Sequence, residues 1–339
     1  MDRVLQISPN DHAPFLAVCR NHARSLGMLG LDVETVFLES RLDTRADDCT
    51  YLDADALRRR ANDHEVLLTH RYKGYLLGNE VRSAGSRHIA VAHEFGLFAR
   101  AGRRFRQRFH NTDVVFAGVS QPVADDIAQS NRRAGRVEVL PNSVDVERLS
   151  TSTLSRLDAR RRLNIVHDAF AIGVVGRLHP KKNPALALRG FELMRANLPV
   201  PATLIFVGTG DLAESLRAQA GDGVSFVGYQ PDAATFMRAF DVLLVTSTDR
   251  EAFGMTIIEA MVARTPVICA DRPGPREVLG DEGCYFEGDD PGALARALVE
   301  FATDLQVRQA RTDAAYQRVV DQFSVEALAR RFERLLRGP

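Results

Sequence analysis

The chain has 339 residues, of which 45% are apolar and 26% charged, and its 44 basic and 44 acidic residues cancel. The length suits two domains of ordinary size, the composition excludes a disordered or fibrous protein, and the zero net charge does not indicate nucleic-acid binding. No apolar run approaches the roughly 20 residues of a membrane span, and the scattered cysteines predict neither a zinc site nor a disulfide framework.

The first half of the chain alternates strand-like and helix-like patterns. A strand is predicted at 3–8, a helix at about 14–29, and further strands at 33–38, 66–69, 88–92, 113–119 and 137–140. Such alternation predicts a parallel sheet with helical crossovers, and such sheets bind ligands beyond the carboxyl ends of their strands. The residues that follow Ser8, Thr69, Ala92 and Val119 are therefore predicted to form the functional edge.

Polar side chains follow three of these strands. Asn10 and Asp11 come after the first strand and either meet an acceptor or form a turn, and turn-residue statistics slightly favour the turn. His70 ends the stretch LLTH and is a weaker acceptor-side candidate. His93 and Glu94 follow the strand IAVA, where a lone histidine is more often structural than functional.

The segment from Leu97 to Phe109 carries five arginines and no acid. Phe98, Ala101, Phe105 and Phe109 recur near helical spacing, so one face of the predicted helix is apolar and the other basic. The favoured interpretation is a surface helix packed on its own domain. The alternative is a helix that rests on an anionic membrane or meets an acidic, phosphorylated acceptor.

The second half repeats the alternation, which predicts a second Rossmann-like sheet. Strands are predicted at 169–177, 203–207, 224–227, 242–245 and 266–270, and a helix at 183–197. The stretch GTGD lacks the G-x-G-x-x-G pattern of a dinucleotide site, so an NAD site is not favoured. The predicted organisation is a first domain at 1–146, a linker at 147–168, a second domain at 169–322, and a last helix at 323–339 that packs across the junction.

The stretch between Asp241 and Ala263 predicts a strand, a polar loop and a buried helix. Glu259 lies among apolar helix residues and needs a polar partner, because an unpartnered buried carboxylate is costly. That partner is either a pair of ribose hydroxyls or an arginine on a neighbouring element. Free amides at the helix start favour a phosphate or diphosphate, and they belong to Gly254, Met255 and Thr256.

Two motifs of the second half resemble those of a known family. Glu251 and Glu259, with Phe253 and Gly254 between them, resemble the E-x7-E motif of the retaining glycosyltransferases of GT-B fold, in particular glycosyltransferase family 4 (group 1). The stretch VVGRLHPKKNP resembles the G-R-L-x-x-x-K signature of the same family. The resemblance is strong over 172–286 and weak before 137, and the Gly-rich turn that family members often carry after the first strand is absent here.

The resemblance implies a role for each matched residue. Glu251 would face the donor sugar and Glu259 the nucleotide ribose, while cationic side chains would neutralise the leaving diphosphate. In AHEFG the histidine would donate a hydrogen bond to a donor-sugar hydroxyl, and the loop after the FVG strand resembles the place where the base is held. The implied catalytic set is His93, Glu251, Arg177 and Lys182, and the implied donor-binding set is Phe253, Gly254, Met255, Thr256, Glu259 and Tyr229.

The resemblance further implies an α/β protein of two Rossmann-like domains facing across a cleft. Such an enzyme would move a sugar, with retained anomeric configuration, from a nucleotide diphosphate-sugar to a hydroxyl of a glycan or lipid-linked acceptor, in surface polysaccharide or lipopolysaccharide synthesis. It would need no metal and no other cofactor, and no nucleic-acid partner is expected. With no signal-peptide core at the start, we expect a cytoplasmic protein, with peripheral contact at the inner membrane face through the segment from Leu97 to Phe109.

Two alternatives stay open at this stage. One is a sugar-nucleotide epimerase or hydrolase on a related two-domain scaffold. The other is a non-catalytic partner subunit that keeps the fold, which the intact set of Arg177, Lys182, Glu251 and Glu259 disfavours.

Overall fold

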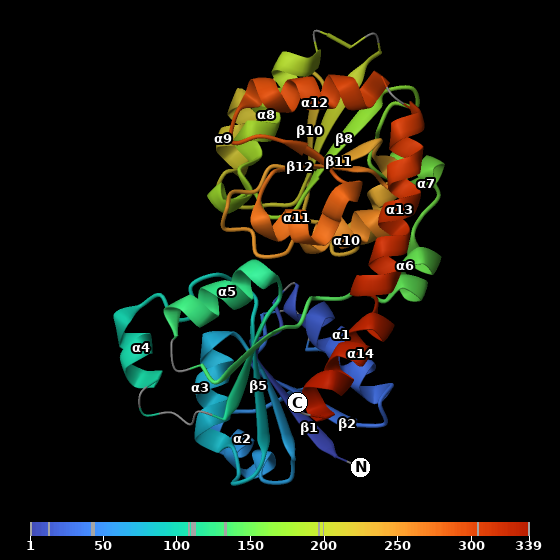
Figure 1. The fold of residues 1–339 in the computed structure, drawn as a ribbon. Coiled ribbons are helices and arrows are strands. Elements are labelled where there is room, and N and C mark those ends of the chain that lie inside the picture. The colour runs from blue at the N-terminus through green and yellow to red at the C-terminus, as the bar shows by residue number, and fades with distance from the viewer. Residues whose placement is uncertain are drawn as a thin grey trace. The chain divides into compact units, whose positions relative to one another are not determined.

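The computed structural model describes residues 2–12, 14–41, 45–107, 109, 113–131, 134–195, 197–198, 200–303 and 305–337. The chain forms two compact α/β units, of which the first comprises Met1–Val144 with Gln322–Pro339 and the second Asp145–Asp321. Each unit contains one parallel sheet, and Figure 1 shows helices along both sheets. The prediction of two Rossmann-like sheets is confirmed.

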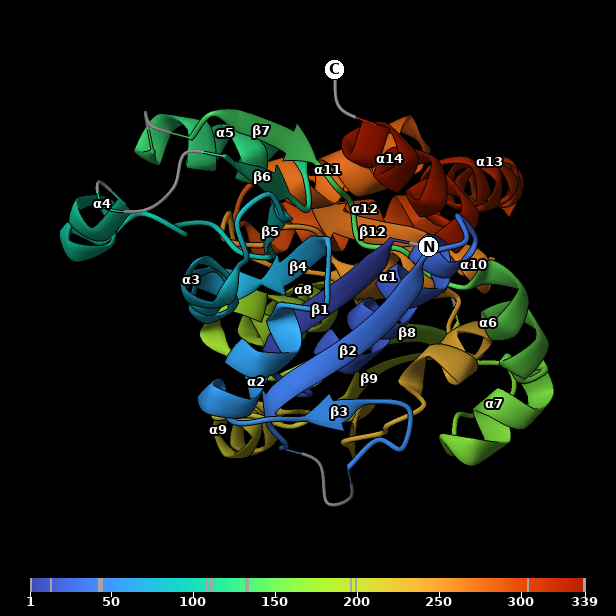
Figure 2. The same cartoon turned by 90° about the horizontal axis from the view of Figure 1, so that it is seen from below.

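The first unit is built on a seven-stranded parallel sheet of order β3-β2-β1-β4-β5-β6-β7, which can be followed in Figure 2. Leu5, Ile7, Val36 and Leu67 are part of one core cluster of this sheet. The strands β1 and β4 are buried almost throughout, as expected for parallel strands covered on both faces. The strands are β1 (Arg3–Asn10), β2 (Asp32–Glu39), β3 (Thr50–Tyr51), β4 (Val66–His70), β5 (Arg87–Ala92), β6 (Val114–Gly118) and β7 (Arg136–Val139). The helices are α1 (Phe15–Gly27), α2 (Ala54–Ala61), α3 (Arg71–Val81), α4 (Ala101–Gln107), α5 (Gln121–Ser130) and α14 (Val325–Arg337).

The second unit is built on a six-stranded parallel sheet of order β10-β9-β8-β11-β12-β13. In Figure 1, α8 and α12 lie side by side over one face, where Leu186, Phe191, Leu294 and Leu298 join the core. The strands are β8 (Phe170–Val175), β9 (Ala202–Val207), β10 (Val224–Gly228), β11 (Val242–Val245), β12 (Val267–Ala270) and β13 (Cys284–Phe286). The helices are α6 (Val146–Ser152), α7 (Arg156–Arg162), α8 (Pro184–Arg195), α9 (Ala213–Gln219), α10 (Met255–Val262), α11 (Pro273–Leu279), α12 (Pro291–Thr303) and α13 (Leu305–Phe323), with short 3-10 helices η1 (Pro180–Lys182), η2 (Ala233–Ala239) and η3 (Gly280–Glu282).

The strand order places a switch point in each sheet. In the second unit β8 and β11 are neighbours although β9 and β10 lie between them in the sequence, and in the first unit β1 and β4 are related in the same way. Connections leave such a neighbouring pair in opposite directions, so the ends of the two strands stay uncovered and form the usual ligand crevice. The carboxyl ends of β8 and β11, and those of β1 and β4, are therefore the places where binding residues are expected.

The predicted linker is instead an ordered part of the second unit. Residues 147–168 contain most of α6 and all of α7, and Arg160 is only 3% exposed. The Arg160 guanidinium donates to the Asp241 carboxylate at 2.7 Å and to the carbonyls of Ala239 and Ala169 at 3.1 and 2.9 Å. The polar, basic composition of residues 147–168 predicted a linker, but one of its arginines, Arg160, is buried. Two of the partners of Arg160, Asp241 and Ala239, lie far away in the sequence.

The last helix belongs to the first unit. Ser25 in α1 donates to the carbonyl of Val325 at 2.8 Å, and the edge of the His22 ring faces the Phe332 ring with centroids 5.4 Å apart. A β-bridge between Val144 and Ser324 leads the chain into this position. The helix α14 therefore packs on α1, which the composition of residues 323–339 does not reveal.

The basic segment buries only part of its apolar stripe. Phe98 is fully buried, but Phe105 is 58% and Phe109 76% exposed, with their ring centroids 5.4 Å apart. The favoured interpretation, a helix packed on its own domain, is therefore wrong for two of the three phenylalanines. Arg108 of this segment lies outside the described residues. Among the described helices, none is long and apolar enough to cross a membrane.

Candidate functional site

The strand, loop and helix predicted from Asp241 onward are present. β11 is fully buried, and α10 begins directly after Gly254, whose φ of +96° favours glycine. A Cβ at Gly254 would also approach the Ile257 side chain to 2.8 Å. Phe253 is buried, and the N-cap residue of α10 is Gly254, which has no side chain to cap the helix. The amide groups of the first turn are therefore available to an anion.

Glu251 is held by two polar neighbours in the loop before α10. Lys182 Nζ donates to Glu251 Oε2, and Ser247 Oγ donates to the same oxygen at 3.0 Å. Burial raises the pKa of the Glu251 carboxyl, but the charge and hydrogen bond of Lys182, aided by Lys181 and Ser247, bring that pKa below its ordinary value. Glu251 is therefore ionised at neutral pH and fixed in position.

Glu259 differs from Glu251 because it makes no hydrogen bond or ion pair within the part of the chain that the structure describes. Glu259 is half-buried, and burial raises the pKa of its carboxyl to about 7 against the opposing charge of Lys182. Of the two predicted partners, the neighbouring arginine is not found. A ligand hydroxyl remains as the predicted partner.

The structure brings three of the predicted residues to one depression. Arg177 follows β8 and is exposed, and it lines this depression together with Lys182 and Thr256. The depression lies at the carboxyl ends of β8 and β11, the switch point of the second sheet. Two cations and a helix N-terminus around one concave surface are suited to a diphosphate.

The loop after β9 packs against the loop after β8 that carries Arg177. A Cβ at Gly208 would lie 2.0 Å from the carbonyl oxygen of Gly176, and one at Gly210 would lie 2.4 Å from that of Leu178. Leu178 N also donates to the carbonyl of Thr209 at 2.9 Å. The glycines of GTGD therefore let two loops pack backbone to backbone, and this explains why a Gly-rich stretch occurs here without a dinucleotide pattern.

Tyr229 is not part of this depression. It follows β10 at the edge of the sheet, its side chain is 61% exposed, and it is absent from the residues that line the depression. Its contact with a base stays a prediction.

A glycine in α11 fixes the position of the Glu251 loop. A Cβ at Gly274 would lie 2.3 Å from the Glu251 carbonyl oxygen. We expect Gly274→Ala to lower stability by about 1–3 kcal/mol through overpacking. Donor turnover should fall by about 100-fold, because a shift near 1 Å displaces a positioned group. The measurements are thermal unfolding and initial rates.

The matched control for this variant is Gly27→Ala. Gly27 ends α1 of the first unit, and a Cβ there would meet nothing within 4 Å. Its stability and rate should equal those of the wild type. Full activity of Gly274→Ala would show that the loop tolerates the displacement, and would remove the argument for a fixed Glu251.

In the first unit the predicted histidines form a hydrogen-bonded chain with Gln6, in which Gln6 and His70 are buried and His93 is half-buried. His70 Nδ1 lies 2.9 Å from His93 Nε2, and His70 Nε2 lies 3.1 Å from Gln6 Oε1. Gln6 Nε2 donates to Thr35 Oγ1 and to the Cys19 carbonyl, both at 2.9 Å, so Gln6 Oε1 must act as an acceptor. Nothing in the sequence pattern marked Gln6 as a partner of these histidines.

This chain fixes the hydrogens of the two imidazoles. His70 Nε2 carries a hydrogen for Gln6, so His70 Nδ1 is bare and His93 Nε2 must donate to it. Burial and the Arg71 charge lower the pKa of His93 to about 3, so the ring is neutral at pH 7. Its Nε2 hydrogen is therefore occupied by His70, and a hydrogen bond from His93 to a donor sugar stays a prediction.

Asp11 and Asn10 differ in their partners. Asp11 accepts from Ser40 Oγ and the Arg41 amide at 2.6 Å and from the Tyr51 hydroxyl at 2.9 Å, which supports the turn interpretation. Burial raises its pKa, but these hydrogen bonds bring it below the ordinary value. Asn10 lies within β1 rather than after it, and its Oδ1 is buried without a hydrogen-bond partner among the described residues.

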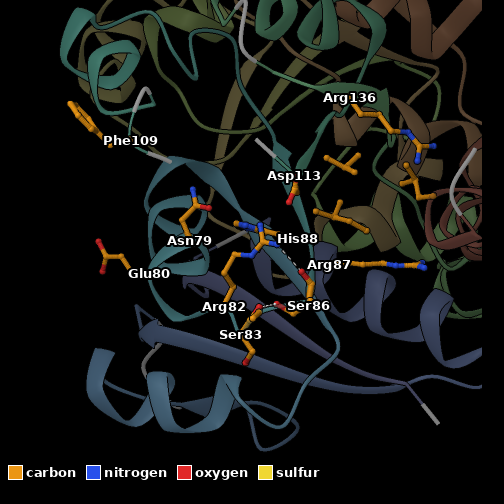
Figure 3. A pocket seen from close by; sticks show the side chains of 15 residues that line it. Asn79, Glu80, Arg82, Ser83, Ser86, Arg87, His88, Phe109, Asp113 and Arg136 are labelled. Carbon is orange, nitrogen blue, oxygen red and sulfur yellow. Dashed lines mark hydrogen bonds between the residues drawn. The ribbon is translucent and has the colours of Figure 1, made fainter. Parts of the chain in front are cut away.

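One cavity of the first unit lies at the amino ends of the strands, opposite the predicted functional end of the sheet. This cavity of about 860 Å³ is lined by Arg87 and Arg136, which begin β5 and β7. Figure 3 shows Arg82, Ser86 and His88 together on one wall. Parallel sheets bind ligands at their carboxyl edge, so we do not place the reaction here. No cluster suited to hold a metal occurs among the described residues.

Comparison with known proteins connects the second unit to a family. Residues 169–304 match the family described as glycosyl transferases group 1. The D-inositol 3-phosphate glycosyltransferase of Streptomyces avermitilis is 32% identical over 224 residues, 60% of this chain and 48% of the relative. The phosphatidyl-myo-inositol mannosyltransferase of Mycolicibacterium smegmatis is 34% identical over 225 residues, 60% of this chain and 56% of the relative. The chain thus matches about half the length of these relatives.

Solved structures share the whole fold. HepE of Anabaena, in complex with UDP and glucose, superposes with a TM-score of 0.79 at 19% identity over 100% of both chains. WaaG, a glycosyltransferase involved in lipopolysaccharide biosynthesis, superposes with a TM-score of 0.76 at 13% identity over 99% of this chain and 100% of WaaG. At these identities the likeness shows the fold, which is GT-B.

Proposed function

Because residues 169–304 match the group 1 glycosyltransferases, we propose that the chain transfers a sugar from a nucleotide diphosphate-sugar to an acceptor hydroxyl with retention of configuration. The observation that carries the proposal is that two carboxylates with different surroundings, Glu251 and Glu259, lie near the start of one helix. Glu251 is ionised and held by Lys182, whereas Glu259 has no partner in the described part of the chain. A donor with a diphosphate beside a ribose would use both.

The donor would be held by charge and by hydrogen bonds. Its diphosphate would accept from the amides at the start of α10 and face Arg177 and Lys182, which supply positive charge as the leaving group becomes more negative. Glu259 would accept from the ribose hydroxyls, and Glu251 from hydroxyls of the donor sugar. We propose that this arrangement makes the transfer independent of a divalent metal.

The transfer step would occur on one face of the sugar. The acceptor hydroxyl attacks the anomeric carbon from the side on which the bond to the phosphate oxygen breaks, and the departing phosphate oxygen takes the hydroxyl proton. Glu251 would orient the donor rather than attack it, because Lys182 and Ser247 already bind its Oε2. Fixed positions of the reacting groups supply part of the rate increase.

A thermal-shift panel tests the donor site. UDP, GDP, ADP and their common sugar conjugates are added, with a chelator present, to the wild type and to Glu259→Ala. We expect one base to stabilise the wild type by about 2.7 kcal/mol at 100 times its Kd, and the shift to shrink in the variant. If no nucleotide at millimolar concentration stabilises the wild type, the donor site is wrong. Sugar release without an acceptor, in place of transfer, would favour a hydrolase.

We also propose that the acceptor belongs to surface polysaccharide or lipopolysaccharide synthesis and that the basic segment touches the inner membrane face. The support is the exposure of Phe105 and Phe109 beside arginines. Arg103 does not take part, because its guanidinium lies 4.2 Å from the Tyr72 ring centre and donates to the Leu97 carbonyl.

Vesicle flotation tests this membrane contact. We expect Phe105→Ser with Phe109→Ser to weaken binding to anionic vesicles by about tenfold or more, because two apolar side chains no longer insert. Leu157→Ser replaces a similarly exposed apolar residue of the second unit and serves as control. Equal flotation of all three proteins would remove the membrane proposal without affecting the donor site.

A further inference from the structure

Both members of the Lys182–Glu251 ion pair are tied to the residues that directly follow β11. Thr246 Oγ1 donates to the Lys182 carbonyl at 2.9 Å, and Ser247 Oγ donates to Glu251 Oε2 at 3.0 Å. Thr246 is only 2% exposed. We propose that Thr246 is a positioning residue, which fixes the backbone from which Lys182 reaches Glu251 and the donor diphosphate. This proposal rests on the proposed transferase function and adds a residue that sets the geometry of its cation.

Lys182 lies in a turn that depends on its surroundings. It ends η1, a single 3-10 turn with hydrogen bonds from Lys182 N to the His179 carbonyl at 2.8 Å and from Asn183 N to the Pro180 carbonyl at 3.0 Å. One helical turn fixes several dihedral angles for very few hydrogen bonds, so it needs support from outside. Asn183 adds to this need, because its φ of +46° lies in the left-handed region. The position of Lys182 is therefore set by what packs against the turn.

The end of the neighbouring strand β11 supplies that support. The Lys181 carbonyl accepts from Thr248 N at 2.9 Å and from Thr248 Oγ1 at 3.2 Å. The Lys182 carbonyl accepts from Thr246 Oγ1, and Glu251 N donates to the Thr248 carbonyl at 3.1 Å. One short segment after β11 thus holds both the lysine turn and the loop that carries Glu251. An ion pair between residues 69 positions apart therefore depends on consecutive residues of that segment.

Thr246 holds the turn by its side chain, whereas Thr248 does so mainly by its backbone. The Thr248 amide makes the shorter of its two contacts with the Lys181 carbonyl, and a substitution would keep that amide. Thr246 meets the Lys182 carbonyl through its hydroxyl, so valine would remove this contact and keep the size of the side chain. Losing a hydrogen bond between a buried hydroxyl and a carbonyl is unfavourable, so the turn is expected to shift.

Thr246 also lines the depression between the two cations, which raises the alternative of a direct contact with the ligand. The hydroxyl has one hydrogen, and that hydrogen is directed to the Lys182 carbonyl. The two roles differ in one measurable respect. If Thr246 acts through Lys182, its substitution has no further effect in the Lys182→Met background, whereas a direct contact would be lost in either background.

Initial rates in a double-mutant cycle test the proposal. We expect Thr246→Val to lower kcat about 10- to 100-fold, because a displaced cation loses its effect on the leaving group. In the Lys182→Met background the same change should lower kcat by less than about twofold. Thr246→Ser keeps the hydroxyl and should retain most of the wild-type rate. The matched control is Thr265→Val, since Thr265 is 3% exposed, donates to the Met237 carbonyl at 2.8 Å and does not line the depression.

A second readout does not require transferase activity. Burial raises the pKa of the Glu251 carboxyl, and the charge and hydrogen bond of Lys182 bring it below its ordinary value. In Thr246→Val this pKa should rise, which carbon-13 NMR of labelled glutamate measures, with Glu251→Gln to assign the signal. Thr265→Val should leave the pKa unchanged. If the wild type binds no nucleotide but the pKa rises in Thr246→Val, the proposed function fails and the role of Thr246 toward Lys182 stands.

Three results would overturn the inference. An unchanged Glu251 pKa in folded Thr246→Val would show that Lys182 keeps its place without the hydroxyl. An equal fall of kcat in both backgrounds would assign Thr246 a direct contact with the ligand. A loss of rate in Thr265→Val as large as in Thr246→Val would attribute the effect to general loosening of the second unit. If Thr246→Val does not fold, Thr246→Cys, which retains a weak donor, should show the same changes to a smaller degree, and their absence would refute the inference equally.

Discussion

Lys182→Met is expected to lower the rate of sugar transfer by about 100- to 1,000-fold, the usual effect of removing one group that stabilises developing negative charge. The protein should also lose about 2–3 kcal/mol of stability, because Glu251 would remain buried without its cation. The loss is smaller than for a fully buried pair, since the Lys182 side chain is 33% exposed. Initial rates and chemical denaturation measure the two effects.

The double variant Lys182→Met with Glu251→Gln separates stability from catalysis. Glutamine carries no charge, so the double variant should regain most of the stability that Lys182→Met loses. Its transfer rate should stay low, since neither the cation nor the carboxylate is restored. Lys181→Met, a change at the adjacent lysine, should leave stability nearly unchanged. If Lys182→Met proves as stable and active as the wild type, the ion pair has no role in the reaction.

The sequence identified the members of this pair but not the pair itself. The strand and helix patterns place Arg177 and Lys182 after a strand and Glu251 before a helix, and the resemblance to the family's motifs marks them as site residues. The ion pair spans 69 positions in the sequence. It depends on β8 and β11 being neighbours in the sheet, and no local pattern encodes that strand order.

The same limit explains what was missed in the first unit. Gln6 lies within an apolar strand, and the sequence gives no sign that its side chain has a polar partner. In the structure it determines which hydrogens His70 and His93 carry. Arg71 was not singled out, because a positive φ at a non-glycine residue has no sequence signature. The position of His93 after a predicted strand marks it as a candidate, and only the family resemblance favours a functional role over a structural one.

The units were also harder to delimit than the sheets. Strand periodicity predicted both sheets, because apolar runs of strand length report burial directly. The sequence of the helices α6 and α7 is polar and basic, so it gives no sign that Arg160 of α7 is buried among partners far away in the sequence. The return of α14 to the first unit depends on contacts with α1, almost the whole length of the chain away.

Glu259 should make both stability and donor binding depend on pH. Its pKa of about 7 in the folded protein lies above the ordinary value of 4.5, so the folded state keeps a proton that the unfolded state has released. The stability of the second unit should therefore fall as pH rises from about 4.5 to about 7 and level off above that. Glu259→Gln mimics the protonated acid, so it should not show this loss and should be more stable than the wild type at pH 8.

Donor binding should show the opposite trend. The ionised carboxylate accepts from the ribose hydroxyls with both oxygens and more strongly than the protonated acid, so affinity for the selected nucleotide-sugar should rise with pH through about 7. Glu259→Gln should bind about 10- to 100-fold more weakly at pH 8, the value of a hydrogen bond to a charged group. A nucleotide-sugar is used because its diphosphate does not titrate in this range, and a 2′,3′-dideoxyribose analogue, which lacks both hydroxyls, should show no rise. A rise that persists in Glu259→Gln would assign the titration to another group and remove Glu259 from the ribose site.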